Sequence, residues 1–350
     1  MTAVRSYQKG HVFRYMSFLC WRIKMNDKPF LTIDKQIELL EKRGLLFQNK
    51  EAAKNNLLSY GYYEIINGYK DCFLDNPLDT EDKFKSGITF EHIFQLFTLD
   101  RNIRSETMSA LEIFEANLRQ ALAYTVAEQI SEDQTKYLDR RNYITGKKQY
   151  NRSLHKMVYP IDALLHILNG ITYAKSEPYK HYREDHHNIP PWIIVKKLNF
   201  GNLIWWYRLL KTPQKRSVTS RMTGLDEALL QQINEFEVGY VSLLSLYLDY
   251  RNTAAHGGRI YNHFSQKHAL PYNSIIHGVI KVSPADYRNG KGQSRLGTLI
   301  NTLQFSKDRT AYNELSVGSR FYINRYLKLY PEEKEFICTQ AELNDEFLAQ

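Results

Sequence analysis

The sequence predicts a mainly α-helical protein, and two observations carry this prediction. Apolar residues recur at intervals of three and four along several segments, as at Leu111, Phe114, Leu118 and Leu122, which is the pattern of one buried helix face. The sequence also contains no strand-rich block, no glycine-rich phosphate loop and no internal repeat. We therefore expect a mainly α-helical fold.

The composition is that of a folded protein and not of a disordered chain. Of 350 residues, 43% are hydrophobic and 24% are charged, and the formal net charge of +9 is compatible with an anionic partner. Three scattered cysteines favour neither a disulfide framework nor a zinc site and fit a reducing compartment. No apolar run is long enough to span a membrane. We expect a cytoplasmic protein without a membrane partner.

Residues 1–24 differ from the sequence that follows them. They are basic and aromatic with a short apolar patch at residues 15–21, and no small-residue cleavage site follows that patch. Met25 precedes the first regular helical pattern, which suggests that it is the natural start. We therefore predict three regions: an extension at 1–24, a helical region at 25–265 and a mostly helical C-terminal region at 266–350.

The helices are predicted in order from their periodicity, caps and breakers. Thr32 is a candidate N-cap, and Gly44 closes the first helix. We expect helices at 32–43, 51–60, 90–128, 154–171, 192–210 (two stretches meeting near Gly201), 225–248, 294–303, 316–329 and 331–336, with polar segments at 76–89, 131–151 and 175–191. The tyrosines and glycines at 60–69 are predicted to pack in an aromatic core, in preference to forming a base-stacking platform.

The segment 243–258 is an apolar helix that carries polar groups at its end. Asp249, Arg251, Asn252 and His256 precede a glycine pair, which ends a helix because glycine tolerates positive φ. His256 therefore lies in or just beyond the last turn. There the helix dipole favours a protonated imidazole, and a carboxylate such as Asp249 would add to this effect. Such a histidine is a candidate general acid or base.

Arg251 offers a planar fork of donors that suits a phosphate. On a straight helix, positions five apart point about 140° away from each other. Arg251 and His256 therefore converge only if the helix opens at its end or if a second copy supplies the other half of the site. The alternative is structural: a helix-end histidine bonded to a carbonyl, and a surface arginine, because short motifs also arise by chance.

Two other polar groups have competing interpretations. Glu115 and Arg119 are four residues apart on a predicted helix, so they form a salt bridge or face the site, and we favour the salt bridge. The adjacent His186 and His187 resemble metal ligands, but they lack a helical or cysteine-containing ligand spacing. We interpret them as solvated surface and expect neither a metal nor a cofactor.

Ten short blocks, in order along residues 28–263, carry a resemblance to a known family. They are KPFLTID (28–34), RGL (43–45), YGYY (60–63), NGY (67–69), LDRNIR (99–104), ALEIFEANLR (110–119), PPW (190–192), NFGN (199–202), RNTAAH (251–256) and RIYN (259–262). Together they resemble the bacterial Abi-like (abortive infection, phage resistance) family of the HEPN superfamily. The chain departs from the family pattern at Ala254, where a cysteine is usual, and at His263, where an arginine is frequent.

The resemblance implies an HEPN-like helical bundle with additional helices at both ends, and a homodimer with a composite active site. Arg251 and His256 would be the catalytic pair, with Asn252 supporting them. The resemblance implies metal-independent RNA cleavage that leaves 2′,3′-cyclic phosphate and 5′-OH ends. Further residues expected to bind RNA or to support the site are Asp249, Arg259, Asn262, Arg119, Glu115, Arg104 and Asp100.

Three functions are compatible with these residues. The first is a phage-defence endoribonuclease, a toxin that is restrained until infection. The second is a non-catalytic HEPN-like module that binds RNA or a nucleotide, and the third is a helical scaffold. The intact Arg251, Asn252 and His256 favour the first. A regulatory RNA or an antitoxin is a candidate additional partner.

Overall fold

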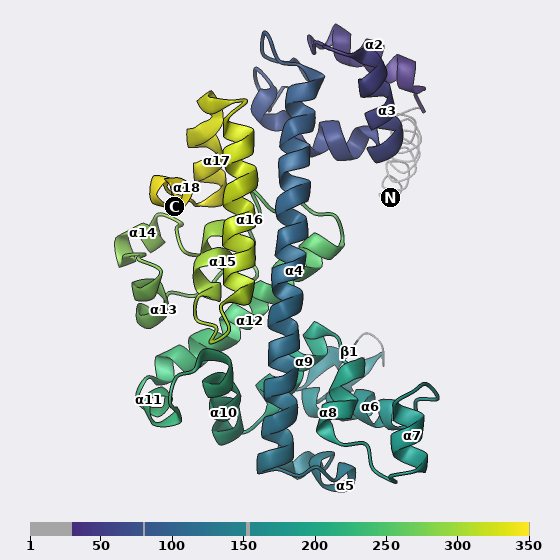
Figure 1. The fold of residues 1–350 in the computed structure, drawn as a ribbon, viewed down its shortest axis with the longest axis vertical. Coiled ribbons are helices and arrows are strands. Elements are labelled where there is room, and N and C mark those ends of the chain that lie inside the picture. Colours follow the sequence, from purple (N-terminus) through teal and green to yellow (C-terminus); the bar gives the residue numbers. More distant parts are fainter. Residues whose placement is uncertain (1–29, 80, 152–154, 350) are drawn as a thin grey trace, which may run out of the picture. The chain divides into compact units, whose positions relative to one another are not determined.

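A computed structural model describes residues 30–79, 81–151 and 155–349 (Figure 1). Helices dominate these residues. The regular strands among them are β1 (Gln149–Asn151) and β2 (Lys156–Val158), which pair antiparallel with Tyr150 opposite Met157. The predicted mainly α-helical class is confirmed. The predicted extension at 1–24 lies outside the described residues.

The chain forms two compact units, one up to Phe97 and one from Thr98 onward. The 40-residue helix α4 (Phe90–Gln129) contributes residues to both. The boundary expected near residue 265 does not separate compact units. Helices on both sides of it pack together in the second unit, where α12 (Asn234–Ala255) contacts α15 (Leu296–Leu303).

In the first unit, α2 (Ile33–Lys42) packs against α3 (Lys50–Tyr60). The Thr32 hydroxyl accepts a hydrogen bond from the backbone N–H of Lys35 at 3.4 Å, as an N-cap does. Gly44 follows the helix with a φ of +90°. These contacts confirm the predicted limits of the first helix.

The tyrosine- and glycine-rich segment is packed against aromatic residues of the same unit. The rings of Tyr60 and Tyr69 lie 5.2 and 5.7 Å from the ring of Phe97. Two short helices follow α3: a π-helix η1 (Tyr63–Asn67) and a 3-10 helix η2 (Lys70–Phe73). The prediction of packing in an aromatic core is confirmed for Tyr69, which is buried, whereas Tyr60 makes its ring contact while 37% exposed.

The second unit contains the remaining helices. In chain order after α4 they are α5 (Gln134–Tyr137), η3 (Arg140–Asn142), α6 (Pro160–Thr172), α7 (Tyr179–Glu184), α8 (Pro191–Ile194), η4 (Val195–Lys197), α9 (Phe200–Leu209), α10 (Thr212–Thr223), α11 (Glu227–Gln232), α12, α13 (Ser274–Val279), α14 (Pro284–Arg288), α15, α16 (Thr310–Leu327), η5 (Pro331–Glu333), α17 (Lys334–Ala341) and α18 (Asp345–Ala349).

Several predicted boundaries in this unit were wrong; for example, the helix expected from residue 316 begins at Thr310 as α16. The helix expected from residue 154 begins at Pro160, because the β1–β2 hairpin occupies the preceding residues. Proline is favoured in the first helical turn, where its missing N–H has no helical partner to lose. The helix expected at 225–248 is divided at Ile233 into α11 and α12.

The core of the second unit forms around α12, as the apolar sequence of that helix predicts. The ring of Phe114 on α4 makes edge contacts with Tyr247 on α12 at 4.8 Å and with Phe200 on α9 at 6.2 Å. Figure 1 shows α12 running between α9 and α15, and both helices contact it. The polar end of α12 is therefore carried by a well-packed helix.

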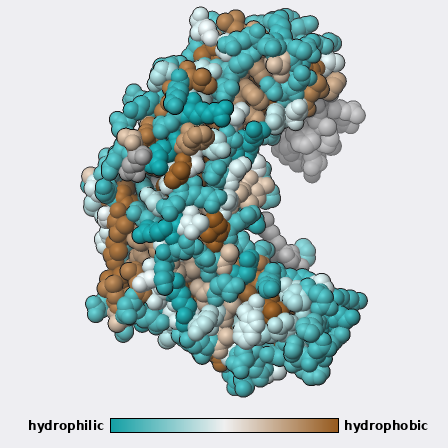
Figure 2. Space-filling view, viewed as in Figure 1, coloured by the Kyte–Doolittle hydropathy of each residue, from teal (hydrophilic) through white to brown (hydrophobic). Residues whose placement is uncertain are grey.

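The face drawn in Figure 2 is mainly hydrophilic, and its hydrophobic residues gather in small groups. None of the described helices combines the length and apolar character needed to cross a bilayer.

Candidate functional site

Helix α12 keeps regular hydrogen bonding to its end. Ala255 is the last helical residue, and His256 is the C-cap with φ −97° and ψ 14°. The backbone N–H of His256 donates to the carbonyl of Asn252 at 3.0 Å. The helix therefore does not open before His256, which removes one of the two ways in which His256 and Arg251 could converge.

The glycine pair gives the helix its sharp end. Gly257 has a φ of +76°, a conformation that other residues rarely adopt. A Cβ atom on Gly258 would lie 2.6 Å from the Cγ2 atom of Thr253, so Thr253 would have to shift to admit a side chain there. The Gly258 N–H also donates to the Thr253 carbonyl at 2.8 Å. The predicted glycine stop is confirmed.

Two charged residues of α4 hold the loop after His256. Nη1 of Arg104 donates to the Gly257 carbonyl at 2.7 Å, where a cation also complements the C-terminal end of the α12 dipole. Oδ1 of Asp100, a fully buried residue, accepts from the backbone N–H groups of Ile260 and Tyr261 at 2.8 and 2.7 Å. Asp100 and Arg104 therefore fix the loop that follows His256.

Arg251 is half-buried at the edge of the packed face of α12. Its position continues the row of Leu244 and Tyr247, which are both buried. The Nε atom of Arg251 is buried and has no hydrogen-bond partner among the described residues, and no carboxylate of that part of the chain pairs with the guanidinium. A buried donor left in this state costs about 1–3 kcal/mol. An anionic ligand would remove that cost.

His256 and Asn252 are exposed and lie on another face of α12. By helical spacing they continue the row of Ser245 and Asp249, whereas the backbone direction of Arg251 is about 140° from that of His256. A single chain therefore presents the arginine and the histidine on different faces of one regular helix.

The carboxylate of Asp249 is engaged by two histidines other than His256. Its Oδ2 lies 2.8 Å from Nε2 of His263, and its Oδ1 lies 3.7 Å from Nε2 of His268. Burial raises the pKa of Asp249, but the hydrogen bond and charge of His263 and the charge of His268 outweigh it, so the pKa is lowered. The expectation that Asp249 would support His256 is therefore corrected, because the loop after α12 folds back and brings His263 and His268 to this carboxylate.

Glu115 and Arg119 form the salt bridge that their spacing predicts. Nη2 of Arg119 lies 2.6 Å from Oε1 of Glu115, and it also donates to the Leu198 carbonyl at 3.4 Å. The contacts of both side chains are therefore made within the second unit. Arg259 is exposed and Asn262 half-buried, on either side of the residues that Asp100 holds.

Comparison with known proteins gives one family. The sequence pattern of the family described as Abi-like protein matches residues 55–262, which is more than half of the chain. The matched part includes α4 and the end of α12 and stops directly after the loop that Asp100 holds. No curated protein and no solved structure matches the chain.

Proposed function

The chain belongs to the Abi-like protein family, whose name refers to abortive infection, a defence against phage. From this premise we propose that it is a metal-independent endoribonuclease of the HEPN type, with Arg251 and His256 as its catalytic residues. The observation that carries the proposal is the half-buried Arg251 guanidinium with an unpaired buried Nε, on the helix that ends at an exposed His256.

Arg251 would bind the phosphate at which the strand is cut. Its Nε and Nη groups can donate two parallel hydrogen bonds to two phosphate oxygens. As the phosphorus becomes pentacoordinate, negative charge grows on these oxygens, so a fixed cation there lowers the barrier. Because no described carboxylate pairs with Arg251, its charge remains available to the ligand.

His256 would act as the general base. The neutral imidazole takes the proton of a ribose 2′-OH, and the resulting oxygen attacks the adjacent phosphorus. The P–O5′ bond breaks, an imidazolium donates a proton to the leaving O5′, and the products carry a 2′,3′-cyclic phosphate and a 5′-OH. DNA lacks the 2′-OH and would not be cut. The exposed position of His256 leaves it open to a strand.

A homodimer would bring these groups together. Since α12 remains regular to His256, Arg251 and His256 of one chain point in different directions. Two α12 ends that meet about a two-fold axis would place the Arg251 of one protomer beside the His256 of its partner. The hydrogen bonds that Asp100 accepts and Arg104 donates would hold each loop in the shape required for this meeting.

The test is cleavage of a mixed RNA pool in EDTA, with analysis of the end groups. We expect wild type to leave cyclic-phosphate ends and both His256→Ala and Arg251→Ala to lose cleavage. Matched controls are His166→Ala, an exposed histidine of α6, and Arg320→Ala, a half-buried arginine of α16.

Equal cleavage by wild type and His256→Ala would contradict the proposal. A wild-type protein that binds RNA but does not cut it, even with extract from phage-infected cells, would favour a non-catalytic RNA-binding module.

A further inference from the structure

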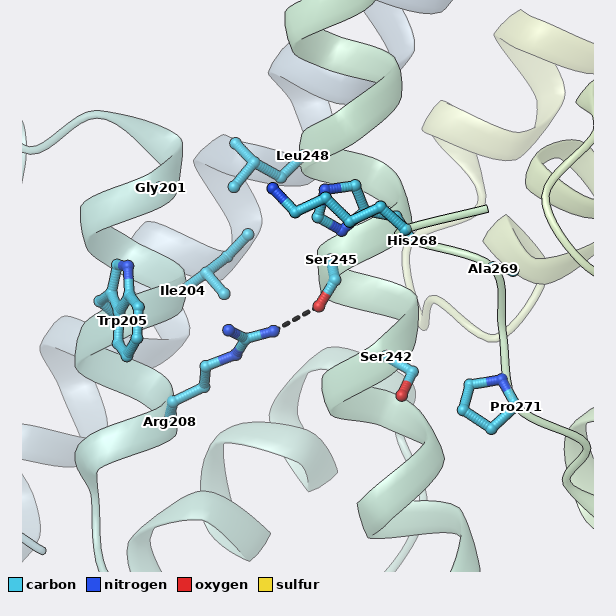
Figure 3. A pocket seen from close by; sticks show the side chains of 11 residues that line it. Gly201, Ile204, Trp205, Arg208, Ser242, Ser245, Leu248, His268, Ala269 and Pro271 are labelled. Carbon is cyan, nitrogen blue, oxygen red and sulfur yellow. Dashed lines mark hydrogen bonds between the residues drawn. The ribbon is translucent and has the colours of Figure 1, made fainter. Parts of the chain in front are cut away.

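A cavity of about 380 Å³ lies between α9, α12 and the chain at residues 267–271, all within the second unit (Figure 3). This volume is in the range of sites for small organic ligands. The residues that line it are Gly201, Ile204, Trp205, Arg208, Ser242, Ser245, Leu248, Lys267, His268, Ala269 and Pro271. The site residues predicted from the sequence include none of these.

The lining combines positive charge with apolar surface. Arg208, Lys267 and His268 are basic; the lining itself contains no carboxylate, but His268 lies 3.7 Å from the carboxylate of Asp249. Trp205 stands on α9 beside Arg208: its ring lies 5.6 Å from the Arg208 guanidinium, and the residue is 38% exposed. A cation beside an accessible aromatic ring is the combination that binds a phosphate together with a base.

Among the described residues, most N–H donors of Arg208 have no hydrogen-bond partner. Figure 3 shows its guanidinium reaching from α9 toward Ser245 on α12, to which Nη2 donates a hydrogen bond. The Ser245 hydroxyl in turn donates to the Val241 carbonyl at 2.9 Å, which leaves its oxygen to accept from Arg208. This bond uses one of the five N–H donors of the arginine.

The remaining donors of Arg208 include a buried one. Its Nε has no hydrogen-bond partner among the described residues, and no carboxylate in that part of the chain pairs with it. Burial lowers the pKa of the guanidinium, which reflects the cost of holding a charge away from water. A phosphate in the cavity would supply both the missing acceptor and the missing negative charge.

The cavity is in line with His256 along α12. Ser242 and Ser245 line the cavity, and steps of three or four residues lead from them through Asp249 and Asn252 to His256. At 1.5 Å per residue, Ser245 and His256 are about 16 Å apart along the axis. The cavity and His256 thus lie on one face of α12, and between them Asp249 is contacted by His263 and His268 of the returning loop.

We propose that this cavity binds a nucleotide, with the phosphate on Arg208 and Lys267 and the base against Trp205. The nucleotide is either part of an RNA strand that continues toward His256 or a free mononucleotide. The strand form rests on the proposed ribonuclease function, whereas the binding of a nucleotide does not.

The experiment measures binding and not cleavage. All proteins carry His256→Ala, so that RNA stays intact, and EDTA is present. The probes are a fluorescent single-stranded RNA and, separately, AMP. The variants are Arg208→Gln, which retains a donor for Ser245, and Lys267→Ala, which changes an exposed side chain. Arg320→Gln on α16 is the matched control for the loss of one positive charge.

We expect Arg208→Gln to weaken binding at least about tenfold and to reduce the salt dependence by about one phosphate contact. Lys267→Ala should weaken it less. If RNA binding falls and AMP binds to none of the proteins, the occupant is a strand. If AMP binds to the parent protein and is lost with Arg208→Gln, the cavity also takes free nucleotides.

Unchanged binding of both probes by Arg208→Gln would overturn the inference, as would an equal loss with Arg320→Gln. If wild type cuts RNA in the cleavage test but Arg208→Gln binds both probes normally, only the inference about the cavity is rejected. If wild type cuts no RNA in the cleavage test but nucleotide binding is lost with Arg208→Gln, only the proposed ribonuclease function is rejected.

Discussion

Two regions of the second unit meet at the end of α12, and they use their charged groups in opposite ways. On α4, Asp100 accepts two backbone hydrogen bonds, and Arg104 donates to the Gly257 carbonyl. On α12, Arg251 has a buried Nε without a partner among the described residues, and His256 is exposed. The α4 groups complete the fold, whereas we propose that the α12 groups bind a ligand. Substitutions should therefore affect stability in the first region and activity in the second.

Asp100→Ala should have the largest effect on stability. It leaves two buried N–H groups without an acceptor, so the free energy of unfolding should fall by about 3 kcal/mol. Asp100→Asn keeps an oxygen in place and should lose less. Denaturant unfolding of both variants measures the difference. An Asp100→Ala protein as stable as wild type would show that the loop is held by other contacts.

Arg104→Ala should have a smaller effect. The arginine is half-buried, and the carbonyls that it caps can turn to water, so we expect a loss of about 1–2 kcal/mol in the free energy of unfolding. Arg104→Lys should recover part of this loss because it returns a cation to the helix end. A lysine variant no more stable than the alanine variant would argue against the charge effect.

Asp249→Asn should have the smallest effect, and it should depend on pH. Because the pKa of Asp249 is lowered in the folded protein, its ionised form adds stability above the ordinary value of 3.8, and this stability is lost as the pH falls through the lower folded value. The substitution should cost about 1 kcal/mol at pH 7 and less in acid. Unfolding curves of wild type and Asp249→Asn, at pH 7 and in acid, measure this difference in the free energy of unfolding. An equal cost at both would contradict the ion pair with His263.

Local patterns predicted much of the fold. The three- and four-residue periodicity after Thr89 predicted the helix that became α4, and the glycine pair at 257–258 predicted the end of α12. The spacing of Glu115 and Arg119 predicted their salt bridge. Each of these features depends on residues close together in the chain.

The features that were missed depend on distant residues. The contact of Asp100 with Tyr261 joins residues 161 positions apart, and no local pattern shows that one carboxylate will serve this loop. The pairing of Asp249 with His263 requires the loop to fold back. Nothing in the local sequence distinguishes Arg208 from other arginines. Only the packing of α9 against α12 places it beside Ser245.

The most direct test of this account is Arg251→Met, with RNA cleavage and unfolding measured on the same preparation. Methionine keeps the apolar stem and removes the charge. We predict that cleavage falls at least about 100-fold, as with other groups that stabilise a developing oxyanion, while the free energy of unfolding stays the same or rises by up to about 3 kcal/mol, because the unpaired buried Nε is removed. Unchanged cleavage together with a loss of more than about 2 kcal/mol in stability would show that Arg251 serves the fold, and the account would be wrong.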